Sequence, residues 1–165
     1  MQTTMQAQHH DLAHAKREYL AFALGAEQYA VDLLQVQEIR GYEAVTRIAN
    51  APEHILGVIN LRGRIVPILD LRVRFGLEHA SFNEQTVAII LNVREAVVGA
   101  VVDAVSDVVQ IGADDIKDTP TLSSTVNTDH MTGMATVDDR MLIMLDMDRF
   151  LSDEDFFARE NVLVA

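Results

Sequence analysis

The chain contains 165 residues, of which 49% are hydrophobic, which is enough for a buried core in one domain or in two small ones. Its formal net charge of −12 argues against nucleic acid or anionic lipid as a partner, because both favour a basic surface. The absence of cysteine excludes disulfides and thiol chemistry, and no apolar run is long enough to cross a membrane.

Residues 1–17 are polar and without a sustained period, so we expect a flexible tail. The tail lacks the apolar stretch of a secretory signal, which makes a cytoplasmic protein the default expectation. His10 and His14 have the i, i+4 spacing of helical metal ligands, but no third ligand lies nearby in the sequence. We therefore interpret them as solvated tail residues and expect no metal site.

The first structured segments follow the tail. Residues 18–31 alternate in the manner of a hairpin that turns at 25–27, and residues 32–38 fit one helical turn leading into a strand. Residues 39–48 are typical of a strand with a break at Arg40-Gly41. A proline in Ala51-Pro52-Glu53-His54 suits the first turn of a short helix.

The stretch VINLRGRIVPILDL places an Arg-Gly-Arg inside an apolar run. We expect strands over 58–61 and 65–69 joined by a tight turn at Arg62 and Gly63, where glycine supplies the positive φ that other residues resist. Pro67 cannot donate a ladder hydrogen bond, so its strand should be an edge at that point or carry a bulge. The arginines are therefore expected on the tip of a hairpin.

The second half of the chain gives a similar pattern of short valine-rich strands and polar turns. The predicted elements are a hairpin of 86–93 and 96–102 around Arg94-Glu95, a strand over 103–111, a loop over 114–127, a hairpin of 131–137 and 140–145 around Asp138-Asp139, and a short helix over 147–157.

These short, closely spaced strands indicate small antiparallel barrels or a sandwich. A weak internal echo supports two similar barrels packed together, because FALGAEQYAVDLLQVQEI and IILNVREAVVGAVVDAVSDVV share the order strand, tight turn with Glu, strand, polar-spiked strand.

No catalytic constellation stands out in the sequence. Asp146-Met147-Asp148 begins like a calcium loop, but it lacks the glycine and glutamate that such a loop needs at its sixth and twelfth positions. An alternative function is a small ligand-binding or hydrolytic β-barrel that uses Asp103, Asp107 and Asp146, which would require a concave pocket with converging polar groups.

Charge is unevenly distributed. Residues 38–74 carry six arginines and four acids, whereas residues 95–160 carry fifteen acids and four basic side chains. Arginine is favoured at interfaces because it makes planar, bidentate contacts, although its use can also follow genome composition. Glu38 and Arg62 are candidates for an ion pair near the hairpin turn. Together with exposed valines on a β scaffold, this pattern favours a protein-binding surface.

Two segments, LLQVQEIRGYEAVTRI and LGVINLRGRIVPILDLRVRFG, closely resemble the CheW family of bacterial chemotaxis coupling proteins, and GAVVDAVSDVVQI resembles its second-half signature. The resemblance spans roughly residues 18–151. It implies two five-stranded SH3-like β-barrels with short helices and a C-terminal helix, forming one domain over 18–155 between tails at 1–17 and 156–165. It also implies a free coupling protein, because the chain leaves no room for a second module.

The resemblance implies a non-enzymatic scaffold without cofactors that links the cytoplasmic tips of chemoreceptors to the histidine kinase CheA at the inner face of the membrane. A receptor helical hairpin would bind in a groove between the barrels, and the kinase's regulatory domain would bind the first barrel. The receptor-binding residues would be Val36, Glu38, Arg62, Val87, Gly99, Val105 and Val108, and the kinase-binding residues Gly57, Asn60 and Leu61. Gly99 would leave room for the close approach of a partner helix.

Overall fold

The computed structural model describes residues 16–77, 81–118 and 131–152. Its strands are β1 (Lys16–Leu24), β2 (Glu27–Asp32), β3 (Val36–Gly41), β4 (Ile55–Leu61), β5 (Arg64–Asp70), β6 (Val87–Val93), β7 (Ala96–Val102), β8 (Ala104–Gly112), β9 (Ile116–Lys117), β10 (Met131–Val137) and β11 (Arg140–Leu145). Its short helices are η1 (Leu33–Gln35), α2 (Leu71–Arg74), η2 (Ala113–Asp115) and α3 (Met147–Ser152). None of the helices in these ranges could span a membrane.

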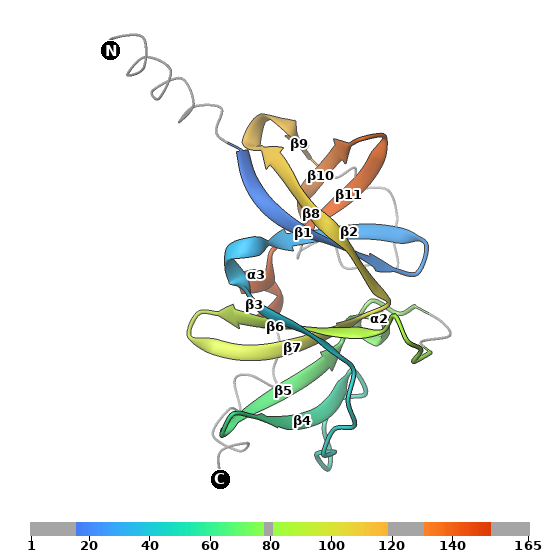
Figure 1. Ribbon diagram of the computed structural model, residues 1–165, viewed down its shortest axis with the longest axis vertical. Coiled ribbons are helices and arrows are strands. Elements are labelled where there is room, and N and C mark those ends of the chain that lie inside the picture. The colour runs from blue at the N-terminus through green and yellow to red at the C-terminus, as the bar shows by residue number, and fades with distance from the viewer. Residues whose placement is uncertain (1–15, 78–80, 119–130, 153–165) are drawn as a thin grey trace.

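The strands form two sheets, one above the other in Figure 1. Sheet A has the order β8-β1-β2-β11-β10-β9, and sheet B has the order β3-β6-β7-β5-β4. This confirms the predicted pair of β subdomains. Sheet A contains six strands rather than the five expected, because the two-residue strand β9 pairs with β10.

The two sheets exchange strands. The β1–β2 hairpin belongs to sheet A, but the chain then crosses through η1 and places β3 on the edge of sheet B, against β6. In the same way the β6–β7 hairpin belongs to sheet B, and the following β8 forms the edge of sheet A, against β1. Each sheet therefore contains strands from both halves of the chain, with β1–β2 in the middle of sheet A and β6–β7 in the middle of sheet B.

The similarity between the two halves that the sequence indicated is also a structural repeat, because equivalent residues of the two halves are paired in the same way. Leu24 pairs with Glu27 at the first hairpin, and Val93 pairs with Ala96 at the equivalent hairpin, 69 positions later. The repeat includes an irregularity: β3 shifts register between Val36 and Glu38, and β8 shifts register at its pairing with Ala21 and Phe22.

The repeat continues through the last hairpin of each half. A β-bulge lies between Ile55 and Gly57 in β4 and between Met131 and Gly133 in β10. After each hairpin, an aspartate side chain accepts a hydrogen bond from a backbone N–H of the next short helix. Asp70 does so for α2, and Asp146 does so for α3. The repeat therefore covers both halves, which is more than the echo in the sequence indicated.

Apolar residues on both faces of the strands form three clusters. The largest lies between the sheets and takes alternate residues of β1, namely Leu20, Phe22 and Leu24. Ala21, which points the other way, belongs to a smaller cluster inside sheet A, and a third cluster lies inside sheet B. This burial on both faces explains why the strands are nearly continuous apolar runs.

All four predicted tight turns lie where the sequence placed them, between β1 and β2, β4 and β5, β6 and β7, and β10 and β11. The helix predicted over 147–157 is present as α3, and its last five positions lie outside the described residues. Pro67 lies in β5, which is central in sheet B, but the pairing of β5 with β7 begins only at Ile68. At Pro67 the strand is therefore paired on one side, as expected.

Two predictions in the first half were wrong. The strand expected over 39–48 ends at Gly41: the Tyr42 amide still donates to the Thr86 carbonyl, but beyond it only Thr46 pairs again, with Val58. The helix start expected at 51–54 is a turn in which the Ile55 amide donates to the Pro52 carbonyl.

Candidate functional site

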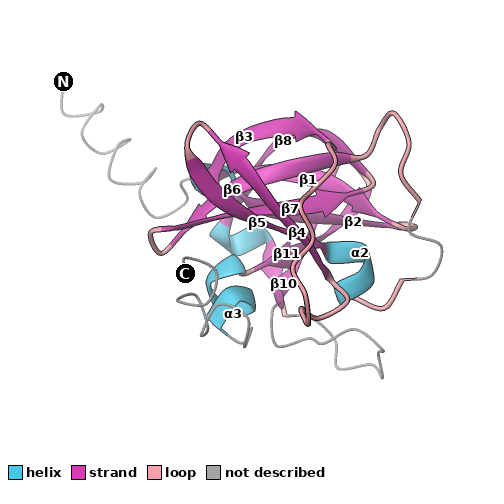
Figure 2. Cartoon of the chain, turned by 90° about the horizontal axis from the view of Figure 1, so that it is seen from below, coloured by secondary structure: helices cyan, strands magenta, loops and turns pink. Residues whose placement is uncertain are grey.

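The two exchanged strands lie on the same side of the molecule and border the core between the sheets (Figures 1 and 2). Val36 on β3, Val87 on β6 and Val105 on β8 are half-buried against that core. Ile39 and Val108 are more open, with exposed fractions of 44% and 46%. These five residues, which we call the edge row, form an accessible apolar lining along β3, β8 and the start of β6.

Glu38, which lies between Val36 and Ile39 in β3, forms with Arg62 the ion pair that the sequence indicated. Arg62 lies in the β4–β5 turn with φ 52°, and the turn is fixed by the Gly63 amide, which donates to Asn60 Oδ1 at 2.8 Å. The Arg62 guanidinium donates to Glu38 Oε1 on β3. Because β3 and β4 are the two edges of sheet B, this contact ties together the open ends of the sheet.

The electrostatic surroundings of Glu38 favour its charged form. The hydrogen bond from Arg62 is the largest influence and lowers the carboxyl pKa below its usual 4.5, against a smaller opposing effect of burial. Arg40 adds a second positive charge, with its Nη1 atom 3.6 Å from Glu38 Oε2. Arg62 itself has a side chain that is 64% exposed, so a partner can still reach it.

The structure places two of the three expected kinase-binding residues away from the surface. Gly57 is buried at the bulge of β4, and a Cβ atom there would lie 2.2 Å from the Thr46 carbonyl oxygen. Leu61 is 5% exposed and packs inside sheet B. Asn60 is exposed, with its side chain capping the hairpin turn. Gly57 and Leu61 therefore have a structural role in packing this hairpin against the rest of sheet B.

Gly99 also differs from its expected placement. It is buried in the middle of β7, and a Cβ atom there would lie 2.5 Å from Ile68 Cδ1 and 3.2 Å from Ile90 Cδ1. The space that the missing side chain leaves is thus occupied by Ile68 of the same chain and not offered to a partner helix. An aspartate at this position would disturb the interior of sheet B, so Gly99→Asp is not a clean test of binding.

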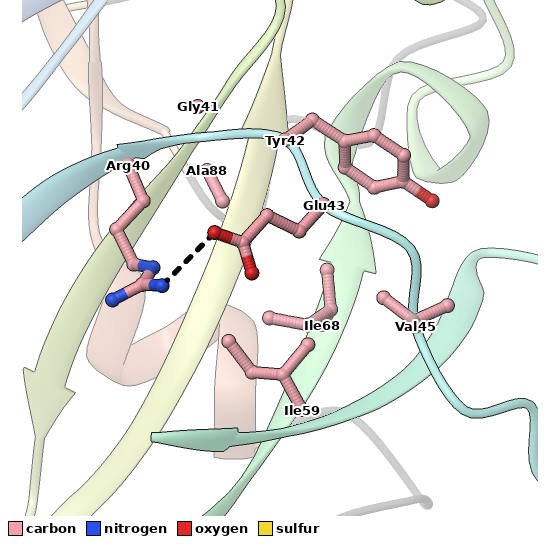
Figure 3. A pocket seen from close by; sticks show the side chains of 8 residues that line it. All are labelled: Arg40, Gly41, Tyr42, Glu43, Val45, Ile59, Ile68 and Ala88. Carbon is pink, nitrogen blue, oxygen red and sulfur yellow. Dashed lines mark hydrogen bonds and ion pairs between the residues drawn. The ribbon is translucent and has the colours of Figure 1, made fainter. Parts of the chain in front are cut away.

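A small pocket opens where β3 leaves sheet B (Figure 3). Its lining includes Arg40 and Glu43, whose Nη2 and Oε1 atoms are 3.1 Å apart, and the apolar residues Ile59, Ile68 and Ala88. Its volume is about 10 Å³, which is room for about one water molecule.

The three acids of the alternative hypothesis do not converge on one site. Asp103 accepts from the Gly25 amide at 2.7 Å and from Arg72, Asp107 is paired with Arg140, and Asp146 caps α3. Among the residues that the structure describes, no group of three or more His, Cys, Asp or Glu residues could hold a metal ion. His10 and His14 lie outside those residues.

Arg72 is the buried charge that sequence reasoning missed. It is 1% exposed and forms a bidentate pair with the equally buried Asp70, with both N···O distances at 2.9 Å. A third contact joins Arg72 Nη1 to Asp103 Oδ1 at 3.0 Å. Burial alone would lower the pKa of Arg72, but the hydrogen bonds that it donates to Asp70 and Asp103, together with their negative charges, outweigh burial and raise the pKa.

The Arg72 network joins the two sheets. Asp103 lies between β7 of sheet B and β8 of sheet A, and it also holds the β1–β2 turn through Gly25. On its other side Arg72 donates to the Ser81 carbonyl and stacks over Phe82, whose ring packs on Tyr42 at 4.4 Å between centroids. The network thus fixes where β8 enters sheet A, and only the alternation of charge in LDLRVR could have signalled it.

Comparisons with known proteins agree on one family. The CheW-like domain family matches residues 18–155. The chain is 50% identical over 146 residues to the chemotaxis protein CheW of Klebsiella aerogenes, covering 88% of each chain. It is 36% identical over 144 residues to the probable chemotaxis protein CheW of Rhizobium etli, covering 87% of this chain and 93% of the relative.

A solved structure agrees with the fold as well as the sequence. The scaffolding protein TtCheW of Thermoanaerobacter tengcongensis superimposes with a TM-score of 0.74 at 34% identity, covering 79% of this chain and 88% of that one.

Proposed function

Since the chain belongs to the CheW-like family and is a coupling adaptor of chemotaxis signalling, we propose that it joins chemoreceptors to the histidine kinase CheA without catalysing a reaction. The proposed receptor contact is the cytoplasmic helical hairpin tip, so the adaptor would act at the inner face of the membrane.

The edge row is the observation that carries this proposal. A surface that binds an amphipathic α-helix typically offers an apolar groove for the apolar face of the helix, with polar residues along the edges of the groove. The edge row supplies the apolar floor, and Glu38 and Arg62 supply a charged rim on its sheet B side. We therefore assign receptor binding to Val36, Glu38, Arg62, Val87, Val105 and Val108, and leave out the buried Gly99.

We assign the kinase contact to the outer side of the β4–β5 hairpin. Asn60 and Ile65 are exposed on this hairpin, and Arg64 at its tip donates to the Glu95 carbonyl of the neighbouring turn at 3.2 Å. Two hairpin turns therefore lie together at this end of sheet B. Exposed arginine and apolar side chains are favoured at interfaces, and these arginines could meet acidic groups of the kinase.

Charge-changing variants of the rim test the receptor contact. We expect Glu38→Lys and Arg62→His to keep the fold and to weaken binding to a receptor signalling-domain fragment by roughly tenfold, because rim charges orient and select a partner. Affinity would be measured by titration calorimetry, and the fold by circular dichroism. A matched control is Asp148→Lys, which changes an exposed ion pair with Arg94 between the β6–β7 turn and α3. Unchanged binding by both rim variants would defeat the assignment.

A further inference from the structure

The repeat of backbone pairing places a second acid at the position equivalent to Glu38. Glu38 pairs with Ile90 of β6, and Asp107 pairs with Ala21 of β1, the residue 69 positions before Ile90. Both acids follow the register shift of their strand. The next residues, Ile39 and Val108, are equivalent as well, because Ile39 pairs with Ile89 and Val108 pairs with Leu20, 69 positions before Ile89. Their exposed fractions are nearly equal, at 44% and 46%.

The second acid also has an arginine partner from the equivalent hairpin. Arg140 begins β11 directly after the Asp138-Asp139 turn, as Arg64 begins β5 after the turn that holds Arg62. Its guanidinium donates to Asp107 Oδ1 at 2.9 Å and to Oδ2 at 3.1 Å. Asp107 is 49% and Arg140 31% exposed, so both remain accessible to a partner.

We propose that Asp107 and Arg140 are a second charged rim of the groove, in which Asp107 is equivalent to Glu38 and Arg140 comes from the hairpin equivalent to that of Arg62, and that a bound helical hairpin contacts both rims. The inference rests on the proposed receptor contact and adds a half-site to it. Each half-site consists of two apolar residues of one exchanged strand, Val36 with Ile39 or Val105 with Val108, beside an acid–arginine pair.

The equivalence also constrains the partner. The two half-sites are related by an approximate two-fold repeat, so an occupant that meets both in the same manner must itself repeat in this way. Two antiparallel helices satisfy this condition, because each helix can present its apolar face to one half-site. A single helix would meet one half-site in the opposite direction to the other.

Charge reversal tests the second rim. Asp107→Lys is expected to weaken binding to the receptor fragment by roughly tenfold, as Glu38→Lys does, whereas the Asp148→Lys control leaves affinity unchanged. If Glu38→Lys weakens binding and Asp107→Lys does not, the second half-site is wrong and the proposed function stands. If neither variant weakens binding, the groove is not the receptor site.

A double reversal separates contact with the partner from a role within sheet A. Asp107→Arg combined with Arg140→Asp restores an ion pair within the chain, and its urea midpoint should return to that of the wild type. Binding should stay weak, because the partner meets the charges in reversed positions. Recovery of both stability and binding would show that the pair only holds sheet A together, and would overturn the proposal.

Discussion

At the scale of single residues, the ion pair of Glu38 determines how its surroundings respond to acid. The hydrogen bond from Arg62 lowers the pKa of Glu38 in the folded chain below 4.5. A carboxyl group with a lowered folded pKa stabilises the fold above its unfolded pKa and loses this effect as the pH falls through the folded value.

We therefore expect Glu38→Gln to lower the free energy of unfolding at pH 7 and to have no effect once Glu38 is protonated. The difference between wild type and variant should shrink steadily below pH 4.5. Urea unfolding at a series of pH values measures this difference. A difference that is the same at pH 7 and pH 3 would contradict the assigned direction of the pKa shift.

Unlike the partly exposed pair of Glu38 and Arg62, the charged side chain of Arg72 is almost completely shielded from water. Arg72→Met would leave the buried Asp70 without its partner, which typically costs about 3–5 kcal/mol of unfolding free energy. The matched control is Arg17→Met, which breaks a pair with Asp32 whose arginine is 59% exposed and should cost at most about 1 kcal/mol. Equal urea midpoints for the two variants would show that the buried network adds little.

At the scale of elements, the tight turns were predictable because their signals are local. A Gly or a pair of charged residues between valine-rich runs identified all four hairpins, and only the φ angles were unknown. Arg62, Arg94, Glu95, Asp138 and Asp139 all adopt positive φ between 50° and 69°. These conformations are costly for residues with a Cβ, so the flanking strand pairs must impose them.

Two glycines allow this cost to be measured. A Cβ atom would meet nothing within 4 Å at either Gly63 or Gly41, but Gly63 has φ +86° and Gly41 lies in an ordinary strand. Gly63→Ala should lower the free energy of unfolding by about 1 kcal/mol, and Gly41→Ala should leave it the same or slightly higher. Denaturant melts of the two variants make the comparison. A neutral Gly63→Ala would mean that the turn tolerates a side chain.

Burial of individual residues within elements was less predictable. The resemblance implied partner contacts for three residues that are buried: Gly57, Leu61 and Gly99. Each is buried by a contact with a distant segment, namely Gly57 by Thr46, Leu61 by the core of sheet B, and Gly99 by Ile68. Likewise, the predicted strand ends at Gly41, and beyond it only Thr46 pairs again, with the distant Val58. Such contacts depend on how strands far apart in the sequence are paired, and local patterns carry no information about that pairing.

At the scale of the whole molecule, the predicted two-subdomain fold was correct, but the exchange of β3 and β8 between sheets was not foreseen. The echo between the two halves showed similar hairpins without showing which sheet the third strand joins. The exchange has a consequence for folding, because each sheet lacks its inner hairpin, β1–β2 in sheet A and β6–β7 in sheet B, until both halves are present.

We expect neither half to fold alone. Fragments 1–77 and 81–165 should each give the circular dichroism of an unfolded chain, because the shared core takes residues from both. Mixing them should restore the β-sheet signal at equimolar ratio. A cooperative thermal transition in either isolated fragment would contradict this expectation.

The exchanged strands also decide how force passes through the adaptor. Pulling the sheets apart would load two backbone crossings, η1 and the junction at Asp103, and the latter is clamped by the buried guanidinium of Arg72. A force applied to one subdomain would therefore reach the other through these two crossings.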